Sequence, residues 1–419
     1  MLLVAWMGWV FDSMDSTLYV LVLTPALKGL LGSGATEAAI AQHGGWILSI
    51  FLIGWAAGGV LFGVLADRIG RTRALVWTIL IYATFTGLAA VSRTWWQLAA
   101  FRFLTALGVG GEWAAGAALV AEVWPGRKRA TAAGILQSAW AVGVFVAALV
   151  NYFVGPFSWR AVFLVGVAPA LLALVIRRNV REPELWSAAI AGGVARGSAG
   201  SRSGEGAAAP RLASLRELFR PEFRRTTWIG FALAFAAVFG LWGVTYWTPV
   251  LLRHLPDTAR IGEAATVHRV SVAVMVLNAG SLAGYLVFAP LAGALGRRWT
   301  FALYYLGALI SVPLTFAPGR TYQATLALLP VLGFFTNGVF TGFAIYLPEL
   351  YPTRLRATGS GFCFNAARVF AATGPFLTGT LVGLFGSFNR AVTAVGTIYL
   401  LGLIVLPLAR ETRGHDLPA

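Results

Sequence analysis

The chain has 419 residues, of which 58% are hydrophobic and only 11% are charged. Soluble globular chains contain about 45–50% apolar and about 25% charged residues, so the composition excludes a soluble enzyme with one or two membrane anchors. The net charge of +16 does not indicate nucleic-acid binding, because basic residues accumulate in the cytoplasmic loops of membrane proteins. The composition therefore predicts an all-α membrane protein.

Twelve apolar stretches follow one another along the chain, each close to the roughly 20 residues that a transmembrane helix needs. They lie at residues 2–27, 45–66, 74–92, 95–121, 130–154, 160–178, 226–252, 269–292, 299–317, 321–347, 357–384 and 390–409. The first stretch contains Asp12 and Asp15 and has no basic residues before it, which is typical of a retained helix rather than a cleaved signal peptide. We therefore expect a multi-pass membrane protein with twelve transmembrane helices.

The basic residues are distributed unevenly between the two sides of these spans. With both termini in the cytoplasm, 22 lysines and arginines fall in cytoplasmic segments and 8 on the opposite side, as the positive-inside rule requires. The remaining two, Arg102 and Arg368, lie within spans. Only two basic residues of the chain, Lys28 and Lys128, are lysines. This bias favours a GC-rich bacterial source, so we expect the bacterial inner (plasma) membrane.

One long hydrophilic stretch, residues 179–225, separates the first six spans from the last six. Its middle is rich in Gly, Ala and Ser, which is typical of a flexible linker. Its end, residues 212–225, combines leucines on one face with arginines around them, which predicts a short helix on the inner membrane surface. We therefore expect an N-terminal six-helix bundle at 1–178, this cytoplasmic linker, and a C-terminal six-helix bundle with a short tail at 226–419.

The two parts of the chain repeat a sequence pattern. Residues 122–131, Glu-Val-Trp-Pro-Gly-Arg-Lys-Arg-Ala-Thr, align with residues 349–358, Glu-Leu-Tyr-Pro-Thr-Arg-Leu-Arg-Ala-Thr. Ile-Gly-Arg at 69–71 aligns with Leu-Gly-Arg at 295–297 at nearly the same offset. A duplication of this kind predicts two pseudo-symmetric bundles with a substrate site between them near the bilayer midplane.

The chain contains one cysteine, Cys363. A single cysteine cannot form a disulfide within the chain, and the sequence lacks the Cys/His spacing that is typical of zinc sites. The four histidines fall in predicted loops, and the sequence has no nucleotide-binding loop and no nucleophile–histidine–carboxylate pattern on a plausible loop. We therefore expect no metal, no cofactor and no enzyme activity.

The stretch from Gly63 to Arg73, Gly-Val-Leu-Ala-Asp-Arg-Ile-Gly-Arg-Thr-Arg, resembles the signature loop between helices 2 and 3 of the major facilitator superfamily. The resemblance implies the major facilitator fold, with this loop latching the two halves on the cytoplasmic side. It assigns latch and gating roles to Gly63, Asp67, Arg68, Gly70, Arg71, Glu122, Arg129, Glu349 and Arg356. Gly293 stands where the second copy would carry the aspartate, so only the first copy is expected to hold the full charge relay.

Shorter motifs resemble the sugar-porter-like, proton-symporting branch of that family. They are Arg102–Glu112, Ala121–Pro125, Arg181–Trp186 and Arg410–Gly414. Gln137 fits the helix 5 pattern of sugar porters, but helix 7 lacks their paired glutamines and helix 10 lacks their Trp/Pro pattern. Phe-Asp-Ser-Met-Asp at 11–15 resembles helix 1 of the aromatic-acid and sialate/lactate proton symporters. The resemblance implies a small organic anion as substrate, with a sugar or polyol as the alternative and drug-type efflux as a third possibility.

Charged residues inside a membrane cost at least about 2.5–3.5 kcal/mol each on insertion scales and therefore point to function. Asp12 and Asp15 share one face of helix 1, and a carboxylate poised between burial, a second acid and an arginine can load and release a proton. The resemblance pairs Asp15 with Arg102, although this pair could also be purely structural. Glu112 is either a second protonatable site or a brace between helices.

Arg368 is the buried cation of the second half, and its planar fork matches a carboxylate. We expect Arg368 to hold the substrate anion with Asn365 one turn away; the alternative is a contact with Glu349 or with backbone carbonyls. Other polar side chains within spans could line the cavity or form helix–helix hydrogen bonds. They are Asn278, Asn337, Gln137 and Tyr246.

Together these features predict a proton-coupled symporter of a monocarboxylate or aromatic acid, in which one six-helix half rocks against the other. Protonation of Asp15 or Asp12 would weaken the contact with Arg102 and allow the loaded carrier to turn. The expected partners are the lipid bilayer, protons and one small-molecule substrate, with no nucleic acid. We expect the protein to act as a monomer.

Overall fold

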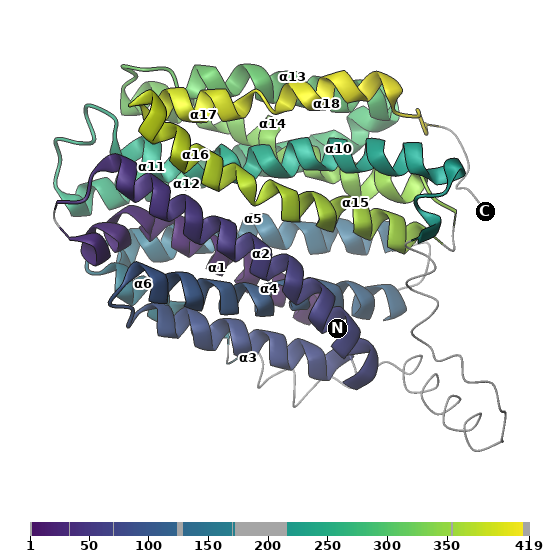
Figure 1. The fold of residues 1–419 in the computed structure, drawn as a ribbon, viewed down its shortest axis with the longest axis horizontal. Helices are drawn as coiled ribbons and strands as arrows, with labels where there is room; N and C mark the ends of the chain where they lie inside the picture. The colour runs from purple at the N-terminus through teal and green to yellow at the C-terminus, as the bar shows by residue number, and fades with distance from the viewer. Residues whose placement is uncertain are drawn as a thin grey trace.

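The computed structural model describes residues 2–32, 34–69, 71–123, 129–169, 171, 216–352 and 355–413. The long helices lie side by side with their axes roughly aligned, and the connecting segments gather at the two ends of the molecule (Figure 1). Helices and turns make up the described residues, and no strand occurs among them. The predicted all-helical architecture is confirmed for this part of the chain.

Among the described residues, six helices precede residue 172. They are α1 (Leu2–Leu31), α2 (Glu37–Ile69), α3 (Arg71–Ala89), α4 (Trp95–Val123), α5 (Arg129–Val154) and α6 (Trp159–Val165). The predicted span 160–178 begins as α6, and most of its remainder lies outside the described residues. The same holds for the predicted linker before residue 216.

The helices after residue 215 include several shorter pieces. They are α10 (Pro221–Gly243), η2 (Thr245–Trp247), α11 (Thr248–Arg253), α12 (Glu263–Leu295), α13 (Arg297–Thr315), α14 (Tyr322–Glu349), α15 (Arg356–Ala371), α16 (Thr373–Phe385), α17 (Phe388–Gly396), α18 (Tyr399–Val405) and η3 (Leu406–Leu408). Within the described residues, eight stretches are long and apolar enough to cross a membrane, and Ser138–Val154 is a shorter apolar helix.

Three predicted spans, 226–252, 357–384 and 390–409, are broken in the structure, and proline explains the first two breaks. A proline inside a helix has no N–H to donate, and its ring clashes with the carbonyl four residues earlier. Pro249 follows the break between α10 and α11, and Pro375 follows the break between α15 and α16, where α15 ends at Ala371.

The predicted surface helix at 212–225 is only partly described; most of its described residues are exposed, and Leu218 packs into the bundle. Leu218 is fully buried, and its carbonyl accepts a hydrogen bond from the Thr227 hydroxyl at 3.1 Å. Phe219 contacts Trp228 and Phe362 through its ring. This segment therefore anchors the start of α10 to the bundle.

The helices before residue 172 meet those after residue 215 along two seams, α2 against α16 and α5 against α12. Glycines allow the first seam to close. A Cβ atom on Gly45 would lie 2.4 Å from the Pro375 carbonyl oxygen, and one on Gly379 would lie 2.5 Å from the Ala41 carbonyl oxygen. Only glycine permits backbones to approach this closely, so larger residues there would force α2 and α16 apart.

Candidate functional site

The most deeply buried charges in the described chain are Asp15 on α1 and Arg102 on α4. Their side chains are both fully buried and form an ion pair with Arg102 Nη1 2.9 Å from Asp15 Oδ2. The Thr86 hydroxyl donates a hydrogen bond to the other carboxylate oxygen. The contact that the sequence predicts between Asp15 and Arg102 is therefore present, and it lies wholly among the helices before residue 172.

Two aromatic rings complete the surroundings of Arg102. Its guanidinium carbon lies 4.5 Å from the centre of the Phe51 ring and 5.3 Å from that of Tyr19. Cations are attracted to the faces of aromatic rings, and the attraction is stronger when water is excluded. Arg102 thus has one ionic and two aromatic partners, and its charge is balanced without any ligand.

Asp12 lies one turn before Asp15 on α1 and is also buried. It interacts electrostatically with Arg368 and with Tyr246, both of which belong to helices after residue 215. The two acids of helix 1 therefore have different environments: Asp15 forms an ion pair with an arginine of its own half, and Asp12 interacts electrostatically with residues of the opposite half.

Arg368 on α15 contacts aromatic rings rather than an acid. Its guanidinium carbon lies 4.5 Å from the ring centre of Trp55 and 5.2 Å from that of Phe364, and its Nη1 donates a hydrogen bond of 3.2 Å to Asn365 Oδ1. No carboxylate of the described residues lies within ion-pair distance of it. The alternative pairing with Glu349 is wrong, because Glu349 binds Arg297.

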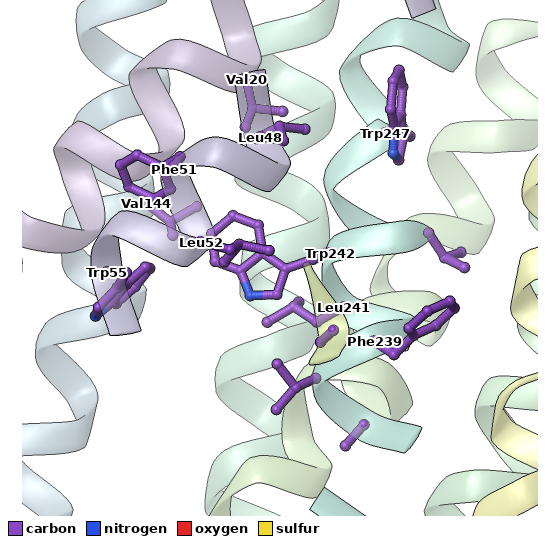
Figure 2. Packing of buried hydrophobic residues seen from close by; sticks show 14 of the residues in the cluster. Val20, Leu48, Phe51, Leu52, Trp55, Val144, Phe239, Leu241, Trp242 and Trp247 are labelled. Carbon is purple, nitrogen blue, oxygen red and sulfur yellow. The ribbon is translucent and has the colours of Figure 1, made fainter. Parts of the chain in front are cut away.

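A group of aromatic rings surrounds this region. Trp55 from α2 stacks on Trp140 from α5 with ring centres 6.1 Å apart, and it meets Trp242 from α10 edge-on at 5.8 Å. Trp242 in turn stacks on Tyr246 at 4.1 Å. Figure 2 shows Trp55 and Trp242 extending from α2 and α10 into the packed layer between them, with Phe51 nearby.

A small cavity adjoins these rings. Its volume is about 50 Å³, and its lining includes Thr17, Trp140, Tyr246, Asn278 and Asn337. The lining combines side chains from helices before residue 172 with side chains from helices after residue 215, so the cavity lies between the two parts of the chain.

Two predicted cavity residues, Asn278 and Asn337, both line this space and also join helices. The Asn278 amide donates to the Ala141 carbonyl on α5 at 2.6 Å, and the Asn337 amide donates to the Ser281 hydroxyl on α12 at 2.7 Å. The two interpretations that the sequence allowed, cavity lining and helix–helix hydrogen bonding, therefore coexist. The side chains of Glu112 and Gln137 lie outside those that the structure describes.

The two seams are closed at the end of the molecule where α2 and α12 begin, which we call the Glu37 end. The Ser49 hydroxyl donates to the Ala372 carbonyl at 2.6 Å, and the Asn151 amide donates to the Ser271 hydroxyl at 2.9 Å. His254 Nε2 lies 3.3 Å from Glu37 Oε1. These contacts all link a helix before residue 172 to one after residue 215, so this end is sealed.

The opposite end carries a charged cluster among the helices after residue 215. Arg297 forms two hydrogen bonds with Glu349, at 2.7 and 3.1 Å. Glu411 accepts hydrogen bonds from the backbone N–H groups of Arg297, Arg298, Thr412 and Arg413. Partial burial raises the pKa of the Glu411 carboxyl, but these four backbone donors outweigh that effect and hold the pKa below its ordinary value.

Most of the predicted latch lies outside what the structure describes. Gly70 is outside the described residues, and the surroundings of Gly63 are not described. The side chains of the other latch residues also lie outside those that the structure describes: Asp67, Arg68, Arg71, Glu122, Arg129 and Arg356. Glu349 is described, and its partner is Arg297. The sequence indicated Arg297 only through the repeated Leu-Gly-Arg, and it gave Glu411 no role.

Sequence analysis also missed the tryptophans of the centre and the hydroxyl of Thr86. The 16 tryptophans and 28 phenylalanines are too numerous for composition to separate ring contacts at a site from packing or membrane-interface anchors. One signal was present, because Trp55, Trp140 and Trp242 lie within predicted spans rather than at their ends, where interfacial tryptophans are concentrated. Thr86 carries no comparable signal.

Comparison with known proteins agrees with this architecture. The sequence model of the Major Facilitator Superfamily matches residues 5–262. The chain is 32% identical to a probable 4-methylmuconolactone transporter of Cupriavidus pinatubonensis, over 97% of this chain and 89% of the relative. It is 30% identical to a niacin transporter of Acinetobacter baylyi, over 100% of this chain and 95% of the relative.

Solved structures show the same fold. The crystal structure of a D-xylose-proton symporter aligns over 99% of both chains with a TM-score of 0.73 and 19% sequence identity. At this level of identity the likeness concerns the fold alone. The predicted major facilitator fold is confirmed.

Proposed function

Since the chain belongs to the Major Facilitator Superfamily and is therefore a membrane transporter rather than an enzyme, we propose that it is a secondary active transporter that carries a small organic anion together with protons. Alternating access of the site between the two six-helix halves, residues 1–178 and 226–419, moves the substrate. The observation that carries this proposal is Arg368, a cation within the spans that contacts aromatic rings and one amide and has Asp12 as an electrostatic partner beyond ion-pair distance.

Arg368 provides the anion-binding group. An uncompensated charge in the membrane interior is costly, and the described residues offer Arg368 no carboxylate at ion-pair distance. A substrate carboxylate would accept two parallel hydrogen bonds from its fork. Asn365 holds the guanidinium from one side at 3.2 Å, which limits the orientations that the fork can take.

The aromatic rings favour a flat substrate. Trp55, Trp140, Trp242 and Tyr246 come from both halves of the chain and already stack on one another. Planar rings stack with offset or edge-to-face geometry on such surfaces. A ring-containing acid therefore matches the surroundings of Arg368 better than a short aliphatic acid does. The relative named as a niacin transporter is consistent with this preference, because niacin is a pyridine carboxylic acid.

Asp12 and Asp15 supply the proton coupling in this proposal. Protonation of Asp12 removes a negative charge that acts on Arg368 across the two halves, which leaves Arg368 to the substrate anion. Protonation of Asp15 weakens its ion pair with Arg102 and loosens α1 from α4. Both steps link proton binding to the contacts that must change when the halves move.

The closed Glu37 end fits a defined state of this cycle. By the distribution of basic residues, with both termini in the cytoplasm, the Glu37 end faces outward. The contacts at this end, such as Ser49 with Ala372 and Asn151 with Ser271, support a carrier that is closed to the outside. We propose the bacterial inner membrane as its location and a monomer as the working unit.

Uptake into proteoliposomes tests the proposal. Under an inward proton gradient we expect accumulation of a labelled ring acid such as benzoate, and loss of accumulation with a protonophore. Arg368→Ala and Asp12→Asn should each abolish accumulation, whereas Arg320→Gln, a matched loss of charge at an external loop, should not. Accumulation of glucose or xylose but of no acid would overturn the proposal.

A sugar or polyol is the second candidate, because the amides of Asn278 and Asn337 line the cavity and amides bind hydroxyl groups well. The two candidates differ in their dependence on Arg368. A neutral substrate does not need the guanidinium charge, so Arg368→Gln should preserve sugar uptake but abolish acid uptake.

A further inference from the structure

A second cavity lies far from the central site, at the end opposite the Glu37 end. It has a volume of about 250 Å³ and is lined by Arg225, Thr226, Ile229, Tyr346, Leu350, Leu408 and Arg410. These residues come from the start of α10, the end of α14 and the segment that follows α18. The cavity is therefore built where three separate parts of the chain meet.

The two arginines of this cavity have no ion-pair partner among the residues that the structure describes. The nearby acids are committed elsewhere: Glu349 binds Arg297 and the Thr412 hydroxyl, and Glu411 accepts four backbone N–H groups. Arg225 and Arg410 are both exposed. The cavity therefore holds two positive charges that point to an anion.

The position of Arg410 is fixed by its surroundings. The hydroxyl of the buried Tyr346 donates to the Arg410 carbonyl at 2.8 Å. Thr227, two residues after Arg225, is fully buried, and its side chain binds the Leu218 carbonyl. Both cations therefore extend from an anchored backbone, which lowers the entropy lost when a ligand bridges them.

An apolar strip begins at the rim of this cavity. Leu408 lines the cavity and is more than half exposed, and Leu400 and Ile404 precede it at four-residue spacing with similar exposure. Residues four apart lie on one face of an α-helix, so Leu400 and Ile404 share a face of α18; Leu408 follows in the 3₁₀ helix η3, and the three exposed side chains form an apolar ridge along this segment. In a membrane such a ridge contacts acyl chains.

We propose that this cavity binds a phosphate group carrying a negative charge, and that the source of this group is the headgroup of an anionic phospholipid such as phosphatidylglycerol. The phosphate oxygens accept hydrogen bonds from Arg225 and Arg410, and the acyl chains lie along Leu408, Ile404 and Leu400. Basic pockets between transmembrane helices are known to bind anionic headgroups. The bound lipid ties the start of α10 to the end of α18 without touching the central site.

Native mass spectrometry and thermal unfolding of the purified full-length protein test this site. Phosphatidylglycerol should bind and raise the midpoint of unfolding, whereas phosphatidylcholine, whose headgroup is neutral overall, should do neither. In Arg225→Gln/Arg410→Gln the affinity for phosphatidylglycerol should fall at least about tenfold, the change expected from losing charge-assisted hydrogen bonds. The matched control Arg216→Gln/Arg224→Gln removes the same charge from exposed arginines outside the cavity and should bind normally.

Soluble anions separate the two sources of phosphate. If inorganic phosphate or glycerol 3-phosphate gives the same Arg225- and Arg410-dependent shift as the lipid, the phosphate site stands and the acyl ridge adds nothing. If only the lipid binds and raises the unfolding midpoint, the source of the phosphate group is the lipid headgroup, as proposed. Equal lipid binding by the wild type and the cavity variant would overturn the proposal, as would the absence of any response. Should the double glutamine variant fail to fold, Arg225→Lys/Arg410→Lys keeps the charges and should retain weakened binding.

Discussion

Two arginines within the predicted spans, one fully buried and one partly buried, have contrasting partners. Arg102 on α4 has Asp15 at 2.9 Å and lies among helices of one half, so its charge is balanced within the folded protein. Arg368 on α15 has Trp55 and Phe364 as neighbours and donates to Asn365. This difference is why we propose that the first arginine holds the structure and controls an acid, and that the second binds the substrate anion.

The largest effect is expected from breaking the Arg102 pair. Arg102→Leu leaves the Asp15 carboxylate buried without its cation, which should lower the free energy of unfolding by about 3–5 kcal/mol. Asp15→Asn/Arg102→Leu removes both charges and should recover much of that loss. Chemical unfolding of the three proteins in detergent measures both values. If the double variant is as unstable as the single variant, the pair is not the source of the effect.

Arg368 should affect binding rather than stability. Arg368→Ala removes a charged donor worth about 1.5–3 kcal/mol, so the dissociation constant of a transported acid should rise roughly 10- to 100-fold while the unfolding midpoint changes little. Arg368→Lys should bind with intermediate affinity, because a lysine keeps the charge but lacks the planar fork. Calorimetric titration measures the affinities. A large loss of stability in Arg368→Ala would make Arg368 a structural residue like Arg102.

Substitutions of Trp55 test whether the aromatic neighbours of Arg368 contribute to acid binding. The Trp55 ring face holds the Arg368 guanidinium at 4.5 Å, a contact worth about 0.5–2 kcal/mol. Trp55→Leu should therefore weaken acid binding by a factor of roughly 2 to 30, whereas Trp55→Phe, which keeps a ring, should weaken it less. Uptake at varied substrate concentration provides the measurement. If Trp55→Leu and Trp55→Phe weaken acid binding equally, the cation–π contact does not contribute to binding.

The smallest effect concerns the charged cluster at the end opposite the Glu37 end. Because the folded pKa of Glu411 is held below its ordinary value of 4.5, its carboxylate contributes stability that is complete well above pH 4.5 and is lost as the pH falls through the lower folded value. Glu411→Gln should therefore lower the unfolding midpoint at pH 7, and the gap from the wild type should narrow below about pH 4.5. Glu222→Gln, an exposed acid at the start of α10, is the control and should show no such gap. If the difference in unfolding midpoint between Glu411→Gln and the wild type does not change with pH, the ionisation of Glu411 does not contribute to stability.

Much of the fold was predictable because the membrane imposes a simple rule on sequence. A spanning helix must satisfy its own backbone hydrogen bonds and present an apolar surface, so apolar stretches of suitable length revealed most of the helices. Proline limited the precision: the breaks before Pro249 and Pro375 lie inside stretches that remain apolar throughout. Hydropathy measures how apolar a segment is, so it does not reveal a helix break that a missing backbone N–H causes.

The candidate site was predictable only in part. Asp12, Asp15, Arg102 and Arg368 were identified because charges are rare and costly within spans. Their partners were harder to identify, because a ring or hydroxyl in a partner helix has no distinctive position in the sequence. The pairing of Glu349 with Arg297 joins residues 52 positions apart, and only the packing of α13 against α14 brings them together.

The sequence by itself determined that the protein is a helical membrane protein, where most of its helices lie and which few charges enter the membrane, because each of these follows from local composition and the cost of burial. The tertiary structure alone decided that Asp15 faces Arg102 while Asp12 faces the other half, and that Arg368 rests on Trp55. It also decided that Arg225 and Arg410 share one cavity. Such contacts depend on the rotation and tilt of whole helices, which are set by side-chain packing between segments distant in the chain.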